Sequence, residues 1–203
     1  MAFYVGERSI SDWRGPRLHL NLFLAWVPYF LGIGLVVVDG KLTNQIGKVI
    51  QVVILLGWFF FFPNAPYLIT DFAYLDWTHY DLWQRVILFC IFAQCGIMLA
   101  MAQLLLVESY LTRHWGKYPA LLFVAISILF AGFGVYVGRF LRWNSWDLVY
   151  HPFAVLADSV QNLNEPMQGI RPAVFSIALS MILGCFYYFV RSVQNASERR
   201  EDY

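Results

Sequence analysis

The sequence predicts an all-α integral membrane protein: a helical bundle of about five transmembrane helices plus a short interfacial helix. Two observations predict this class. Hydrophobic residues make up 60% of the chain and charged residues only 13%, whereas soluble domains average roughly 45–50% and 25%. The apolar residues also form runs of about 20 residues, the length that crosses a hydrocarbon core. We therefore expect a multi-pass membrane protein whose main partner is the lipid bilayer.

Five apolar runs without Asp, Glu, Lys or Arg are the expected membrane spans. They lie at residues 18–38, 49–69, 86–107, 120–137 and 173–190. The first run is too long for the apolar region of a signal peptide and lacks a cleavage pattern, so we expect a retained helix. A shorter amphipathic helix near residues 152–164 is expected to lie in the interface. We expect residues 1–203 to form a single transmembrane domain.

Loop parity gives an expected orientation. Five spans would place the two long connections, residues 70–85 and 138–172, on the same side of the membrane as the N-terminus. Lys and Arg together number seven on each side, so the positive-inside rule is undecided by count alone. All three lysines nevertheless fall on the opposite side, which favours a cytoplasmic C-terminus: Lys41, Lys48 and Lys117.

The segment at residues 61–71 is the most unusual in the chain. Pro63 and Pro66 remove backbone donors, so the second span should kink or unwind near Asn64. Broken helices at membrane depth often line binding sites, because irregular backbone there needs protein or a watery cavity around it. We predict Asn64 and Tyr67 as substrate-binding residues. The alternative is a helix that ends at the interface with Asn64 as its cap.

Carboxylates follow the proline-rich segment. Three carboxylates and an imidazole could bind a divalent cation: Asp71, Asp76, His79 and Asp81. No known metal spacing is matched, so we predict no metal site, and a solvated loop rimmed by interfacial tryptophans is the alternative. The candidate catalytic residues are Asp71, Asp81 and Asp147, because a carboxylate can act as a base or as a cation ligand.

A second polar cluster, at residues 138–147, runs off the end of the fourth span. Two arginines at a membrane boundary can clamp phosphate or carboxylate. We predict a substrate-binding set of Arg139, Arg142, Asn144 and Trp146. If the helix continues, Arg139 and Arg142 share one stripe with Trp143 and Trp146. The alternatives are arginines that snorkel to lipid headgroups or that belong to an internal hydrogen-bonded network.

Four segments together resemble the signature blocks of a bacterial membrane family. They are NLFLAWVP at 21–28, FPNAPYLITD at 62–71, YD at 80–81 and GRFLRWNSWD at 138–147. The family is catalogued as domain of unknown function 1361, and the resemblance spans almost the whole chain. It implies a multi-pass protein of the bacterial cell membrane and supplies no activity, so any cofactor is unknown. His79 stands where the family is expected to have an apolar or aromatic residue, which argues further against a metal.

Three functions stay open. The first is a polar interfacial site that binds or processes an amphiphilic anionic molecule, lipid-like or phosphate-bearing. The second is a structural or accessory subunit of a membrane complex. A transporter ranks last, because the spans lack ionisable residues near the midplane. The net charge of +1 indicates no nucleic-acid partner, and H-E-x-x-H, G-x-S-x-G and P-loop motifs are absent. Whether the chain is an enzyme is left open.

Overall fold

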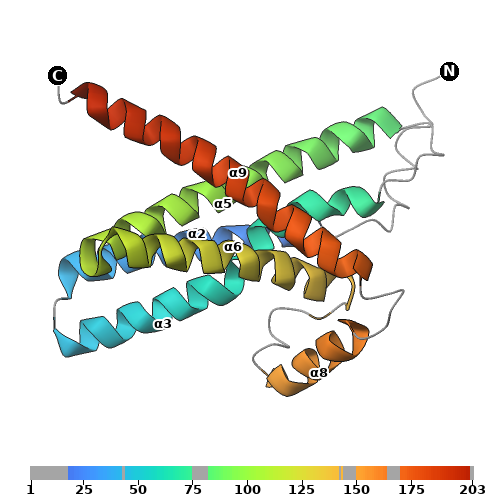
Figure 1. The fold of residues 1–203 in the computed structure, drawn as a ribbon, viewed down its shortest axis with the longest axis horizontal. Coiled ribbons are helices and arrows are strands. Elements are labelled where there is room, and N and C mark those ends of the chain that lie inside the picture. The colour runs from blue at the N-terminus through green and yellow to red at the C-terminus, as the bar shows by residue number, and fades with distance from the viewer. Residues whose placement is uncertain are drawn as a thin grey trace.

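The computed structural model describes residues 18–42, 44–74, 82–141, 143, 150–163 and 170–201. Every regular element within these residues is a helix. Five of the helices are long and apolar enough to cross a membrane. The prediction of an all-α bundle with five transmembrane helices is therefore confirmed, and Figure 1 shows their arrangement. The assignment of the chain to one domain stays a prediction.

Four of the five spanning helices are continuous, and the second is composite. The continuous ones are α2 (Leu18–Lys41), α5 (Leu82–Trp115), α6 (Lys117–Arg139) and α9 (Ile170–Glu201). The composite span consists of α3 (Gln45–Phe61), α4 (Asn64–Tyr67) and the 3₁₀ helix η1 (Leu68–Tyr74). A short helix, α8 (Pro152–Leu163), precedes α9. Polar residues at both ends extend α5 well beyond its apolar run at 86–107.

Two tight reversals connect neighbouring helices. Asn44 caps α3, because its side-chain Oδ1 accepts the backbone N–H of Gly47 at 2.9 Å. Gly116 separates α5 from α6 with a φ of +88°, a backbone conformation that glycine adopts at little cost. These reversals make α2 and α3, and likewise α5 and α6, run antiparallel.

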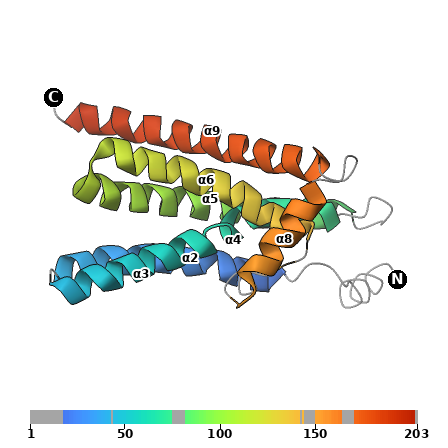
Figure 2. The same ribbon diagram turned by 60° about the horizontal axis from the view of Figure 1, so that its bottom comes forward.

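Helix α5 lies at the centre of the bundle. It packs against α2, α6, α9 and the 3₁₀ helix, while α3 packs mainly on α2 and α9 mainly on α6. Figure 2 shows α2 and α3 in one layer and α6 with α9 in another. The buried face of α5 includes Phe89, Leu104, Val107 and Leu111, so the core forms around this one helix.

The break after α3 follows from its two prolines. Neither Pro63 nor Pro66 can donate a backbone hydrogen bond, and α3 ends at Phe61. The Asn64 side chain donates from Nδ2 to the freed Phe61 carbonyl at 2.9 Å. Helical structure does not end there but continues as α4 and η1, in which Ala65 and Leu68 are fully buried. The expectation of a broken second span is therefore confirmed.

Glycines bring the broken segment close to two neighbouring helices. A Cβ atom at Gly96 of α5 would lie 2.5 Å from the carbonyl oxygen of Ala65. On α6, a Cβ at Gly134 would lie 2.8 Å from Pro63, and one at Gly138 would lie 3.2 Å from Tyr67. Gly134 and Gly138 are four residues apart, the small-xxx-small spacing that is typical of closely packed membrane helices, and both lie at a close contact.

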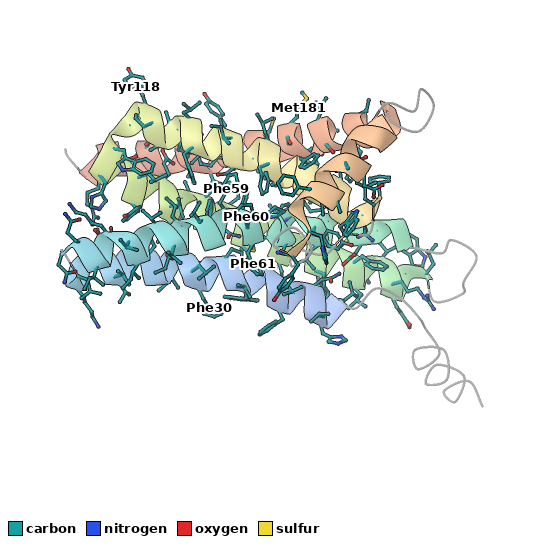
Figure 3. The ribbon with its side chains drawn as sticks, turned by 90° about the horizontal axis from the view of Figure 1, so that it is seen from below. Phe30, Phe59, Phe60, Phe61, Tyr118 and Met181 are labelled. Carbon is teal, nitrogen blue, oxygen red and sulfur yellow. The ribbon has the colours of Figure 1, made fainter. Side chains whose placement is uncertain are left out.

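Large apolar side chains cover the outside of the bundle. Phe30, Tyr118 and Met181 lie at its periphery in Figure 3, and they are 62%, 85% and 66% exposed. An apolar exterior of this extent is stable in lipid and not in water. The chain is therefore a multi-pass membrane protein in contact with the bilayer.

The close approach at Gly96 makes a stability prediction. Gly96→Ala should lower the free energy of unfolding by about 1–3 kcal/mol, the usual cost of overpacking, because the new methyl group meets the backbone oxygen of Ala65. Gly184→Ala is the matched control, since a Cβ at Gly184 meets nothing within 4 Å. Both substitutions gain the same helix propensity, so thermal unfolding in detergent isolates the steric cost. Equal stability of the two variants would contradict the packing.

Candidate functional site

A buried ion pair joins the last residue of α6 to the 3₁₀ helix. Arg139 donates from Nη2 to Oδ1 of Asp71 at 2.6 Å. The side chain of Arg139 is 9% exposed and that of Asp71 is fully buried. The interpretation of Asp71 as part of a solvated loop is therefore wrong. Asp71 belongs to η1, which lies beneath the end of α6, and its side chain is covered there.

Three further side chains complete the network around this pair. Thr70 Oγ1 accepts from Nε of Arg139 at 3.0 Å and from Nη2 at 2.6 Å. From α2, Asn21 donates through Nδ2 to Oδ2 of Asp71 at 3.2 Å. The guanidinium carbon of Arg139 lies 4.6 Å from the centroid of the Tyr67 ring, a cation–π distance. The network thus ties α2, α4, η1 and α6 together.

Burial makes these contacts necessary. Taking a carboxylate and a guanidinium out of water costs several kcal/mol per ion, and only good geometry with additional hydrogen bonds offsets that cost. Both oxygens of Asp71 accept hydrogen bonds, one from Arg139 and one from Asn21. The pair is therefore compensated from within the protein.

A partly open cavity of about 140 Å³ lies next to this network. Its wall includes Asn21 from α2, Asn64 and Tyr67 from α4, and three phenylalanines, Phe60, Phe130 and Phe133. Asn21 and Tyr67 belong to both the network and the wall. The ion pair consequently positions one end of the cavity without itself being part of its wall.

The cavity changes character along its length. On α6 its wall runs from Phe130 to Gly138, about 12 Å of helix at 1.5 Å per residue. Gly138, near the end of α6, lies beside the polar Tyr67, whereas Phe130, about two turns earlier, lies beside Phe60. The cavity is therefore more polar toward the end of α6 and more apolar about two turns earlier.

Trp143 and α8 cover the end of the cavity next to Gly138. The backbone N–H of Trp143 donates to the Val137 carbonyl at 3.3 Å, and its indole Nε1 donates to Asp158 of α8 at 2.9 Å. Trp143 and the fully buried Val155 of α8 both line the cavity. Because α6 ends at Arg139, the hypothesis of a helical stripe from Arg139 through Trp143 is wrong.

The family described as "Protein of unknown function (DUF1361)" matches residues 20–196. The chain belongs to this family. Comparisons with curated proteins and with solved structures find no match. The matched range in this DUF1361 protein includes every residue of the network and of the cavity wall described above. Family membership thus agrees with the resemblance and adds no activity.

Some of the predicted site residues of this DUF1361 protein lie at the cavity or in the ion pair, and the others lie outside the described residues. Asn64 and Tyr67 line the cavity, and Arg139 and Asp71 form the ion pair behind it. The others lie outside the described residues: Asp81, Arg142, Asn144, Trp146 and Asp147. Asp76 and His79 lie outside them too, and the described part of the chain contains no cluster of three or more potential metal-ligating side chains.

Asn21 and Thr70 are residues of the site that the sequence did not lead us to predict. Both are partners of the ion pair, and Asn21 also lines the cavity. The sequence did contain an indication for Asn21, because a polar residue inside an apolar span is by default a candidate for function. The identity of its partner was not readable, since Asn21 and Asp71 are 50 residues apart.

A second group of polar contacts, which includes an ion pair, lies toward the opposite end of the bundle. Glu108 of α5 accepts from the Tyr187 hydroxyl at 2.5 Å and pairs with Arg191 of α9 at 2.6 Å. Asp39 of α2 lies 2.9 Å from Nε2 of His114 on α5. These contacts hold α5 to α2 and α9 near the C-terminal end of α5, so charged side chains pair toward both ends of the bundle.

The ion pair predicts strong coupling between its members. Asp71→Asn and Arg139→Gln should each cost about 3–5 kcal/mol of unfolding free energy, because each leaves a buried charge without its counterion. The double variant should cost at least about 1 kcal/mol less than the sum. Reversible unfolding in mixed micelles measures all four proteins. Additive costs would mean that the two side chains do not interact.

Proposed function

We propose that this protein binds a membrane amphiphile in the cavity, with the polar group of the ligand at the interface and a hydrocarbon segment at depth. The observation that carries the proposal is the change from polar to apolar lining along a single cavity. Asn21, Asn64 and Tyr67 offer hydrogen bonds to a headgroup. Phe60 and Phe130 offer an apolar wall for a chain.

The size of the cavity favours a ligand that is itself part of the bilayer. A volume of about 140 Å³ is close to that of engineered apolar cavities that hold one benzene ring. It accommodates a headgroup fragment or a few methylene groups rather than a whole lipid. The rest of such a molecule would stay among the surrounding lipids, where its apolar part costs nothing to solvate.

Binding is better supported than catalysis. Asp71 is fully buried and each of its two oxygens already accepts a hydrogen bond, from Arg139 or from Asn21, so a role as a general base would compete with these contacts. An anionic headgroup would compete with Asp71 for Arg139. Arg142 remains the other proposed contact for a phosphate, and Asp81 and Asp147 remain the other proposed catalytic groups. We also propose a bacterial cell membrane as the location.

A structural or accessory role is the second candidate. The observation in its favour is that charged side chains at both ends of the bundle pair with one another: Arg139 with Asp71 and Arg191 with Glu108. Such pairs lock helices together whether or not a ligand binds. A transporter is less well supported, since the charged pairs named above lie toward the two ends of the bundle.

Lipid retention tests the proposal. The purified protein should keep about one lipid per chain in native mass spectrometry after detergent exchange. Leu24→Trp should lower this occupancy at least tenfold, because Leu24 lines the cavity and the larger ring fills it. Leu20→Trp is the matched control on the same helix, as Leu20 is exposed and does not line the cavity.

Thermal unfolding of both variants separates lost binding from lost folding. Retention that is equal in the two folded variants would overturn the proposal. Absence of retained lipid from the unmodified protein would do the same and would turn attention to protein partners.

A further inference from the structure

We infer that the ligand enters the cavity sideways from the bilayer, between α3 and α6, and that Phe60 and Phe130 form the gate. This inference rests on the proposed function and specifies its route. A lateral entrance would restrict the ligand to molecules already dissolved in the membrane.

The seam between α3 and α6 is held by rings. Phe59 stacks on Phe130 with ring centroids 4.4 Å apart, and Phe60 meets Phe130 edge-on at 6.0 Å. Neither helix has the other as a main packing partner, since α3 lies on α2 while α6 lies on α5 and α9. Figure 3 shows Phe59 and Phe60 on the side of α3 that faces α6. Opening this seam therefore needs side-chain rotation and breaks no backbone hydrogen bond.

The other walls of the cavity are closed by tighter contacts. The α4 segment cannot move away from α6 without giving up the contact between Pro63 and Gly134, where an added Cβ would lie at 2.8 Å. Next to Gly138, Trp143 and Val155 cover the cavity, and Trp143 is fixed to Asp158 by a hydrogen bond of 2.9 Å. Opening the seam of phenylalanines thus costs less than moving either of these two walls.

The gate faces hydrocarbon. Phe60 is 41% exposed, and one and two turns earlier on α3 the exposed residues are Leu56 and Val53. On α6, Leu129 beside Phe130 is 63% exposed. An outer surface of this composition lies against lipid chains, so the molecules that reach Phe60 and Phe130 are bilayer lipids.

Cross-linking across the seam tests the route. The variant carries Phe60→Cys and Phe130→Cys, with the native Cys90, Cys95 and Cys185 replaced by serine. Delipidated protein is reconstituted into phosphatidylglycerol and phosphatidylethanolamine vesicles that contain a photoactivatable phospholipid. The rate at which that lipid labels cavity residues is compared before and after a short bifunctional thiol reagent joins the two cysteines.

We expect the cross-link to slow labelling at least tenfold, whereas the protein before cross-linking should label at least as fast as the cysteine-free parent. The matched control joins Leu31→Cys to Gly57→Cys, an ordinary van der Waals contact between α2 and α3 in which a Cβ at Gly57 would lie 3.5 Å from Leu31. Its cross-link ties α3 to a neighbour without crossing the seam and should leave the rate unchanged.

The outcomes separate this inference from the proposed function. Unchanged labelling after the Phe60 to Phe130 cross-link would overturn the lateral route and leave lipid binding intact. Equal slowing in the control pair would also overturn it, because general rigidity of α3 would then explain the effect. Absence of cavity labelling in the parent protein would overturn the proposed function and the route together.

Discussion

The ion pair between Arg139 and Asp71 is the constraint on which the site depends. A guanidinium at the end of α6 and a carboxylate in η1 are both removed from water, so each requires the other. Meeting this requirement draws the chain after α3 beneath α6 and brings Thr70 and Asn21 into hydrogen-bonding distance. The same arrangement places Tyr67 between the charged pair and the cavity, which gives that cavity a polar end.

The proline break leaves irregular backbone within the second span, and glycines in the neighbouring helices allow protein to cover it. Pro63 and Pro66 interrupt the helix, and the freed Phe61 carbonyl is satisfied by Asn64. The irregular segment then needs protein around it, because lipid cannot hydrogen-bond to backbone. Gly96 and Gly134 supply that cover by letting α5 and α6 approach the segment closely. The cavity lies where this close packing gives way to the ring-filled seam between α3 and α6.

The fold was predictable from the sequence because the bilayer imposes one simple rule on apolar runs. The break at Asn64 was predictable for a similarly local reason, the missing donors of two prolines. The partner of Arg139 was not, since Asp71 lies 68 residues away and its loop position resembled a solvated one. The end of the fourth span was predicted to within two residues, at 137 against Arg139, and only the conditional continuation of that helix through Trp143 did not hold.

The most direct test is a high-resolution structure of the unmodified protein in lipid nanodiscs. We expect an elongated density that begins near Asn21 and Tyr67, passes Phe133 and leaves the protein between Phe60 and Phe130. Such density would place a bilayer lipid in the cavity and link the buried ion pair to ligand binding. A cavity filled by protein side chains, with Arg139 and Asp71 still paired, would contradict ligand binding and identify the network as a structural lock.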